Sequence, residues 1–272
     1  MTTKADAPGP RWDPAQYQRH SADRTRALTE LVARVPPLPA APRIADLGCG
    51  PGAPTLTLFA RWPDARVTGY DNSPEMLAAA RRVAAPAGGS LDFVEADLAG
   101  WLPAEPPDLI VSNAALQWLP GHWRHLAGWV EALAPGGAIA LQVPGNFAAP
   151  SHALLHEIAG RPRWRERLAG VLRTGSPVLD PARYLEELAP LCAEVDVWET
   201  TYLHRLTGED PVLDWVRGSA LRPVITALDD EPDELAAFVE TYRDALRAAY
   251  PPGPHGTVLP FRRIFAVGRR KP

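Results

Sequence analysis

In the first half of this 272-residue chain, short apolar runs alternate with segments of helical periodicity. The apolar runs, which predict strands, are residues 43–47, 67–70, 91–94, 109–112 and 138–143. The helices predicted between them cover residues 55–61, 73–85 and 123–133. Strand–helix–strand units of this length require parallel neighbours and right-handed crossovers. The chain is therefore expected to adopt an α/β fold with a doubly wound, mostly parallel sheet.

The pattern changes after residue 144. The second half is predicted to contain a mostly helical stretch, a strand, two helices and a last strand, at residues 151–192, 193–204, 208–249 and 258–267. An additional helix is predicted over residues 12–35. We therefore expect residues 1–150 to form an N-terminal helix and a cofactor-binding module. Residues 151–272 are expected to form a helical acceptor or lid region plus the last two strands, packed with the module as one domain.

Composition excludes several classes of protein. The chain has 28 Lys and Arg against 32 Asp and Glu, a formal charge of −4, which argues against a dedicated nucleic-acid binder. Two cysteines cannot form a disulfide framework or a zinc cage of cysteines. No apolar run approaches the ~18–20 residues of a membrane span, and the first residues lack the apolar region of a signal peptide. We expect a cytoplasmic protein without a nucleic-acid or membrane partner.

A glycine-rich loop follows the first predicted strand, where strand one turns into the next helix. Gly48, Gly50 and Ala53 satisfy the dinucleotide pattern G-x-G-x-x-G/A, in which glycines allow a tight turn and close approach of a ligand. A diphosphate requires backbone N–H donors and no nearby anion. Pro51 removes one donor, and Asp46 places a carboxylate beside the loop. That carboxylate suits an ammonium group instead.

Two further acids follow strands two and three. Asp71 lies 19 residues beyond Gly52, where an acid can accept both hydroxyls of a ribose. Asp97 is a third acid at the same edge of the sheet and could receive an adenine amino group. One ammonium, one ribose and one adenine together describe S-adenosylmethionine.

The whole pattern resembles the class I S-adenosylmethionine-dependent methyltransferases, over about residues 40–145. The matching segments are Asp46–Gly52, Gly69-Tyr70-Asp71, Glu95-Ala96-Asp97 and Leu133-Ala134-Pro135-Gly136-Gly137. The resemblance implies a seven-stranded, Rossmann-like sheet with a helical acceptor-binding insertion, and S-adenosylhomocysteine as product. The predicted cofactor contacts are Asp46, Gly48, Gly50, Asp71, Asn72, Asp97, Leu98 and Asn113.

The flanking segments are similar to those of the trans-aconitate 2-methyltransferases. These segments are Trp12-Asp13-Pro14-x-x-Tyr17, Arg24-x-Arg26, Ser112–Pro120, Gln142–Asn146, Val197–Tyr202 and Pro260–Phe265. Two features depart from the family: His20 stands where an aromatic residue is expected, and residues 160–180 match least well. The resemblance implies a carboxyl O-methyltransferase that forms the monomethyl ester of trans-aconitate or of a similar small polycarboxylic acid. We expect the protein to be a monomer.

A carboxylate acceptor needs little from the protein chemically. It is ionised at neutral pH, with a pKa near 4, so no general base is needed. The protein must hold one oxygen about 3–3.5 Å from the sulfonium methyl group and clamp the other carboxylates, preferably with arginine. The chain has no G-x-S-x-G or H-E-x-x-H motif, and we predict neither a catalytic side chain nor a metal.

The candidate acceptor contacts come from several predicted elements. Arg262 and Arg263 are adjacent on the last strand and must face opposite sides, and the resemblance favours Arg263. Gln117 and Trp118 follow strand four and offer N–H donors. Other candidates are a helical-region arginine and one face of the first helix. The full predicted set is Trp118, Gln117, Arg263, Arg222, Tyr17, His20 and Arg24.

Three alternatives remain at this point. A methyltransferase acting on carbon, nitrogen or a hydroxyl would often need a base, for which His20, His122 or His204 could serve. A nicotinamide dehydrogenase is disfavoured by Asp46 and Pro51. A non-enzymatic binding module that keeps the fold would be suggested by loss of the three acids, yet all three are present.

Overall fold

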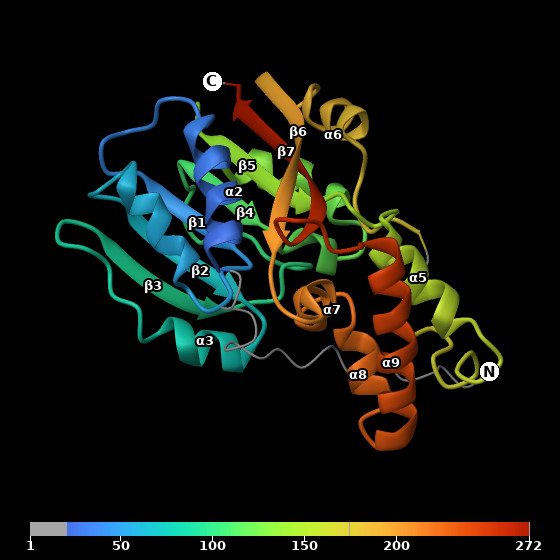
Figure 1. Ribbon diagram of the computed structural model, residues 1–272. Helices are drawn as coiled ribbons and strands as arrows, with labels where there is room; N and C mark the ends of the chain where they lie inside the picture. The colour runs from blue at the N-terminus through green and yellow to red at the C-terminus, as the bar shows by residue number, and fades with distance from the viewer. Residues whose placement is uncertain (1–20, 174, 272) are drawn as a thin grey trace, which may run out of the picture. The chain divides into compact units, whose positions relative to one another are not determined.

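The structure, a computed structural model, describes residues 21–173 and 175–271 (Figure 1). Within this part of the chain seven strands form one sheet, in the order β3-β2-β1-β4-β5-β7-β6. The strands are β1 (Arg43–Leu47), β2 (Arg66–Asp71), β3 (Ser90–Glu95), β4 (Leu109–Asn113), β5 (Ala138–Pro144), β6 (Cys192–Leu206) and β7 (Thr257–Arg270). β1 to β5 pair in parallel, whereas β7 runs antiparallel to β5. The predicted mostly parallel, doubly wound sheet is confirmed.

The predicted strands agree with the observed ones to within a few residues. Residues 109–112 and 138–143, which form most of β4 and β5, are all buried. Parallel strands that are covered on both faces are expected to consist of continuous apolar residues, and such runs were the basis of the strand predictions.

The described chain divides into two compact units. One, which we call the sheet unit, comprises residues 21–145, 177–201 and 262–271; the other, the helical unit, comprises 146–173, 175–176 and 202–261. The helices of the sheet unit are α2 (Ser21–Ala33), η1 (Pro54–Ala60), α3 (Pro74–Ala80), η2 (Leu116–Trp118), η3 (His122–His125), α4 (Leu126–Ala132) and α6 (Pro181–Leu188). Those labelled η are 3₁₀-helices.

Within the sheet unit, α2 packs against both η1 and β5. The predicted start of α3 is confirmed, because Ser73 caps the helix by accepting a 3.2 Å hydrogen bond from the Met76 N–H. The helix ends at Ala80, earlier than the predicted residue 85. The next amides make tighter bonds, Arg82 to Ala79 and Val83 to Ala80, which close the last turn instead of extending it.

The helical unit contains α5 (Pro150–Ala159), α7 (Pro211–Arg217), α8 (Arg222–Ala227) and α9 (Pro232–Ala249). The prediction of two helices over residues 208–249 was wrong, because α7, α8 and α9 occupy this stretch. The chain leaves α7 at Gly218, and Pro223 starts a new first turn, the position at which proline is best tolerated. Residues 161–173, predicted as mostly helical, form turns.

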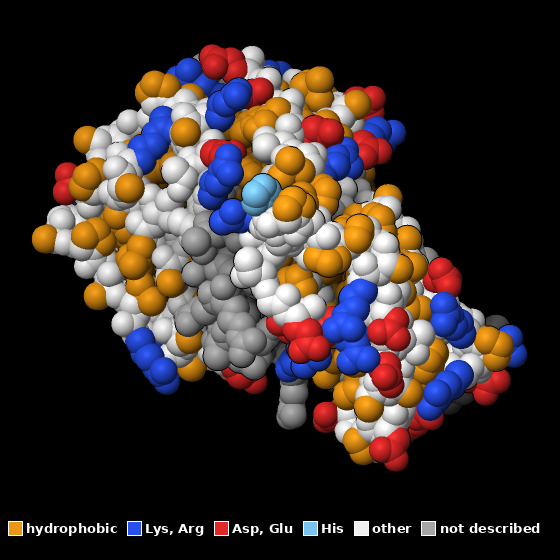
Figure 2. Space-filling view, in the orientation of Figure 1, with side chains coloured by type: hydrophobic (Ala, Val, Ile, Leu, Met, Phe, Trp, Pro, Cys, Tyr) orange, Lys and Arg blue, Asp and Glu red, His pale blue; other side chains and the backbone are white. Residues whose placement is uncertain are grey.

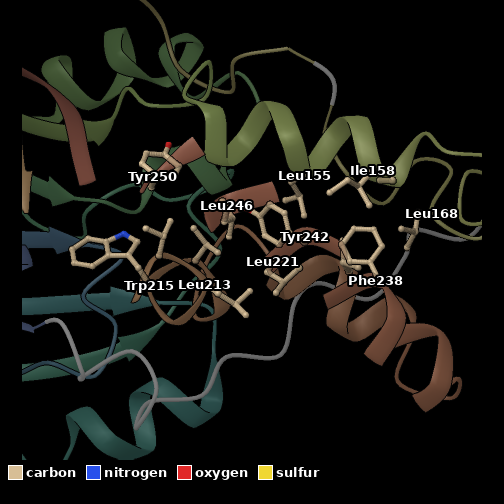
Figure 3. Close-up of a cluster of buried hydrophobic side chains, with 14 of the residues drawn as sticks. Leu155, Ile158, Leu168, Leu213, Trp215, Leu221, Phe238, Tyr242, Leu246 and Tyr250 are labelled. Atoms are coloured by element: carbon tan, nitrogen blue, oxygen red, sulfur yellow. The ribbon is translucent and has the colours of Figure 1, made fainter. Parts of the chain in front are cut away.

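The core of the helical unit is an apolar cluster between α5, α7 and α9 (Figure 3). Phe238 and Tyr242 of α9 are fully buried in it, facing Leu155 and Ile158 of α5. Two tyrosines also bind the start of α5: the Tyr242 hydroxyl donates to the Ser151 carbonyl at 2.7 Å, and the Tyr250 hydroxyl accepts from the Ser151 N–H at 3.1 Å. These bonds join α9 to the first turn of α5.

The visible surface carries mixed charges. On the face drawn in Figure 2, acidic and basic side chains are interspersed and do not form a field of one sign. Partly exposed side chains form ion pairs, such as that of Arg163 with Glu234 at 2.8 Å. No helix among the described residues is long and apolar enough to cross a membrane.

Candidate active site

The glycine loop leaves the carboxyl end of β1 in a conformation that ordinary residues rarely adopt. Gly48, Gly50 and Gly52 have φ values of +76°, +55° and +77°. A Cβ on Gly48 would lie 2.1 Å from the Cβ of Ala115. The Gly48 N–H donates to the Tyr70 carbonyl at 2.7 Å, which holds the loop against β2. Both the turn and the close approach of the loop after β4 therefore require glycine here.

Asp46 is a buried carboxylate at the end of β1, with 6% of its surface exposed. Its Oδ2 accepts a 2.7 Å hydrogen bond from the Thr55 hydroxyl of η1. Burial raises the pKa of Asp46 to about 6, the Thr55 hydrogen bond opposes this rise, and the charge of Asp71 adds to it. A buried carboxylate of this kind would be stabilised by a cationic ligand.

Asp71, the last residue of β2, joins the second strand to the glycine loop. Its Oδ2 accepts from the Gly50 N–H and its Oδ1 from the Ser73 N–H, both at 2.9 Å. Desolvation raises the pKa of Asp71, while backbone hydrogen bonds from Ser73, Gly50 and Asn72 oppose the rise. A carboxylate offers about four acceptor positions, so Asp71 retains capacity for a ligand hydroxyl.

The remaining predicted cofactor contacts follow β2 and β3. Asn72 and Asp97 are exposed, and Leu98 is half-buried. Asp97 Oδ1 accepts from the Ala99 N–H at 2.9 Å. Because β2 and β3 are parallel neighbours, these residues and Asp71 leave the sheet at the same edge. The structure thus gathers them along the edge that carries the glycine loop.

The loop after β4 is strained. Ala114 is the one non-glycine residue of the described chain with a positive φ, +55°, a conformation that costs an ordinary residue about 1–2 kcal/mol. The Ala114 N–H donates to the Gln142 carbonyl at 2.9 Å, and its carbonyl accepts from Gln117 Nε2 at 2.6 Å. One N–H of Gln117 therefore maintains this turn, which presents the half-buried Trp118.

One face of the sheet carries four polar side chains on adjacent strands, which we call the polar row: Asp46, Asn113, Gln142 and Arg263. Register partners point to the same face, as do residues two apart on one strand. Asp46 pairs with Val111, Asn113 with Gln142, and Gln142 with Phe265. The row therefore crosses β1, β4, β5 and β7 in order.

Arg263 lies at the far end of the polar row and is only 2% exposed. Its Nη1 donates to Gln142 Oε1 at 3.1 Å. Arg262 is more exposed. It forms ion pairs with Glu199 at 2.6 Å and with Asp180 at 3.6 Å. The two neighbouring arginines thus have different environments, as their positions on a strand predicted.

The other predicted acceptor residues belong to the helical unit or lie outside the described part of the chain. Arg222 begins α8 in the helical unit and is partly buried. Tyr17 and His20 lie outside the described residues, as does the side chain of Arg24.

The two described histidines that could act as bases are both buried. His122 Nε2 lies 2.6 Å from the Tyr184 hydroxyl, and burial lowers the pKa of His122 to about 4. His204, in the helical unit, packs against Trp215 with ring centroids 4.6 Å apart. These surroundings favour structural roles for both histidines. No group of three or more His, Cys, Asp or Glu placed to hold a metal was found among the described residues.

Sequence reasoning missed Thr55 and Gln142. Thr55 carried no signal, because its contact with Asp46 depends on how η1 folds back on β1. Gln142 could have been found, since it is the one polar residue in the apolar run of residues 138–143.

The arrangement suits a zwitterionic ligand with ribose hydroxyls. Asp46 is placed for an ammonium, Asp71 for hydroxyls, and the left-handed glycines leave room for close approach. Asn113 Oδ1 is buried and has no hydrogen-bond partner among the described residues. This free acceptor could receive a further N–H from such a ligand. The residues present therefore fit S-adenosylmethionine.

Comparisons with known proteins are consistent with this site. Residues 44–137 match a family described as a methyltransferase domain. A protein of Streptomyces coelicolor named trans-aconitate 2-methyltransferase is 60% identical over 267 residues, covering 97% of this chain and 88% of the relative. One of Mycobacterium tuberculosis strain H37Ra with the same name is 47% identical over 258 residues, covering 94% and 95%.

Solved structures support the fold. A methyltransferase from Thiobacillus denitrificans in complex with S-adenosyl-L-homocysteine has a TM-score of 0.50 at 18% identity, covering 98% of this chain and 95% of that one. A putative methyltransferase from Bacillus halodurans has a TM-score of 0.52 at 17% identity, covering 90% and 98%. At these identities the likeness concerns the fold alone.

Proposed function

We propose that this protein, which belongs to the trans-aconitate 2-methyltransferase family, forms the monomethyl ester of trans-aconitate with S-adenosylmethionine as methyl donor. The observation that carries this proposal is the 60% identity to a relative of that name over 97% of the chain. Bound at the glycine loop, S-adenosylmethionine supplies a sulfonium methyl group to a carboxylate oxygen, and the electron pair of the broken C–S bond returns to sulfur.

The acids of the sheet unit hold the donor in this proposal. Asp46 binds the methionine ammonium, directly or through water, and Asp71 binds the ribose hydroxyls. A hydrogen bond to a charged acceptor contributes roughly 1.5–3 kcal/mol. Asp71→Ala should therefore weaken cofactor affinity at least about tenfold. Unchanged affinity by calorimetry in a folded variant would remove Asp71 from the site.

No side chain needs to remove a proton, because the acceptor is already ionised. The protein acts by orientation: Arg263 clamps a carboxylate of the acid, and the loop that presents Trp118 lies at the end of β4, close to the glycine loop through Gly48 and Ala115. Misplacement of the attacking oxygen by 1 Å can cost about a hundredfold in rate.

The central experiment uses wild-type protein with S-adenosylmethionine and a panel of di- and tricarboxylic acids, with esters detected by mass spectrometry. Trans-aconitate should be esterified, and turnover at saturating S-adenosylmethionine should be flat above pH 6. Methylation of a phenol or an amine, with no ester from any acid, would refute the proposed function while leaving the fold intact.

Neighbouring arginines provide a matched pair for testing the clamp. Arg263→Ala should lower kcat/KM by roughly 30- to 1,000-fold, the equivalent of about 2–4 kcal/mol, and should leave cofactor affinity nearly unchanged. Lys at this position should restore only part of the activity, because it lacks the planar fork. Arg262→Ala, which breaks a partly exposed ion pair, should have little effect. Equal kinetics for the two alanine variants would exclude Arg263 as the clamp.

A further inference from the structure

Gln142 is a buried amide within an otherwise apolar strand. It is fully buried, and its neighbours on β5 from residue 138 to 143 are all buried as well. A primary amide is costly to bury unless its donors and acceptor find hydrogen-bond partners. An explanation for this residue must therefore account for both ends of its side chain.

The acceptor end of Gln142 is bonded and the donor end is not. Oε1 accepts from Arg263 Nη1 at 3.1 Å, which also settles which way the amide points. Nε2 is buried and makes no hydrogen bond to any residue that the structure describes. Buried donors in folded proteins almost always have a partner, so an open one beside a guanidinium indicates a ligand that accepts hydrogen bonds.

The choice of an amide at this position is itself informative. A glutamate would occupy nearly the same volume and would give Arg263 an anionic partner. Glutamine gives the guanidinium a neutral partner, leaves its positive charge uncompensated by this contact and adds an N–H donor on the same side chain. A guanidinium and an amide N–H together match the oxygens of a carboxylate.

We propose that Gln142 is part of the acceptor site, where its Oε1 orients the Arg263 guanidinium and its Nε2 donates to the same carboxylate of the bound acid. This proposal rests on the proposed function, because it assumes a carboxylic acid as acceptor. Gln142 then contributes to specificity, since a ligand without an acceptor oxygen at this position would leave its N–H unsatisfied.

The two ends of the polar row differ in charge and in hydrogen-bonding character. Asp46, at one end, is acidic and suits the ammonium of the donor, whereas Gln142 and Arg263, at the other end, are donors only toward a ligand. Asn113 lies between them as the register partner of Gln142. The same face of the sheet thus separates the positive end of one substrate from the negative end of the other.

The decisive variant is Gln142→Glu, which places an anion next to Arg263 in competition with the acceptor. KM for trans-aconitate should rise at least 100-fold, while affinity for S-adenosylhomocysteine by calorimetry should stay within about twofold of wild type. Ser90→Glu is the matched control. It adds the same charge at an exposed position that opens β3, at the opposite end from the carboxyl edge, and should leave both quantities unchanged.

A purely structural role predicts a different result. If Gln142 only supported Arg263 as part of the core, Gln142→Glu would strengthen that contact and leave KM unchanged, which would overturn the inference. If Gln142→Glu fails to bind S-adenosylhomocysteine, Gln142→Met is measured instead. It keeps the volume and removes the amide, so KM should rise at least tenfold; an unchanged KM would overturn the inference.

Failure of the proposed function gives a separate signature. Wild type and Ser90→Glu would then bind S-adenosylhomocysteine but esterify no carboxylic acid, which overturns both proposals. If wild type esterifies trans-aconitate and the Gln142 variants show the same KM for trans-aconitate as wild type, the proposed function stands and only the role of Gln142 is refuted.

Discussion

Replacement of Asp46 by asparagine should stabilise the ligand-free protein at neutral pH and weaken its binding of cofactor. Asp46 is 6% exposed, and its pKa is raised from 3.8 to about 6, mainly by burial. The ionised carboxylate is therefore an unfavourable group in the folded, ligand-free chain. Asparagine has nearly the same shape, cannot ionise and can still accept the hydrogen bond from the Thr55 hydroxyl.

The size of the effect follows from the shift in pKa. Because the pKa of the folded state lies above that of the unfolded state, protonation of Asp46 stabilises the fold. That stabilisation is complete below pH 3.8 and is lost as pH rises through about 6. A shift of about two units corresponds to about 3 kcal/mol of stability that the wild type lacks at pH 7.5. Asp46→Asn should recover up to this amount, on the order of 5–10 °C in unfolding temperature.

Two measurements test the argument. Unfolding of ligand-free wild type and Asp46→Asn is followed at pH 7.5 and at pH 4.5. At pH 4.5 the extra stability of the variant should shrink to about a third, because Asp46 of the folded wild type is then mostly protonated. Calorimetry with S-adenosylhomocysteine at pH 7.5 should show affinity at least about tenfold weaker for the variant. A variant that is no more stable than wild type at pH 7.5, or that is equally more stable at both pH values, would refute the cost assigned to the ionised Asp46.

Three further outcomes follow from individual contacts. Thr55→Val removes the hydroxyl that opposes the raised pKa of Asp46; cofactor affinity should then begin to fall at a higher pH than in wild type, and Thr55→Ser should restore the wild-type profile in calorimetric titrations. Gly48→Ala would place a Cβ 2.1 Å from that of Ala115, so S-adenosylhomocysteine affinity should drop at least about tenfold and the unfolding temperature should fall; a variant with both values intact would refute the close approach. Tyr242→Phe removes the 2.7 Å hydrogen bond to the Ser151 carbonyl and should cost about 1–3 kcal/mol in urea unfolding, without changing cofactor affinity.

The fold of the first half could be predicted because its signal is local. Strands β1, β4 and β5 are mostly buried apolar runs, and Ser73 with Pro74 marks the start of α3 through the geometry of one helix turn. The errors occurred where short elements follow each other in a polar sequence. The stretch from residue 208 to 249 contains a third helix, because a glycine ends α7 and a proline begins the next turn of α8.

The candidate site could be predicted only in part. Asp46 lies near the end of one predicted strand and Asp71 follows the next. These strands had to be parallel, so the convergence of the two acids at one edge was a consequence of topology. Thr55 and Gln142 depend on contacts over distances of 9 and 121 residues, to Asp46 and Arg263. No sequence periodicity indicates such contacts, because they depend on how η1 packs near β1 and on the register in which β7 pairs with β5.

The sequence by itself determined the parallel sheet, the glycine loop and the acids beside it, because each depends on the alternation, spacing or conformational freedom of residues close together in the chain. Tertiary structure alone decided which of two adjacent arginines is buried and which neutral amide it meets. Arg262 and Arg263 are chemically identical and differ only in the face of β7 they occupy. That choice is made by strand register, since β7 pairs antiparallel with β5 and thereby aligns Arg263 with the polar row.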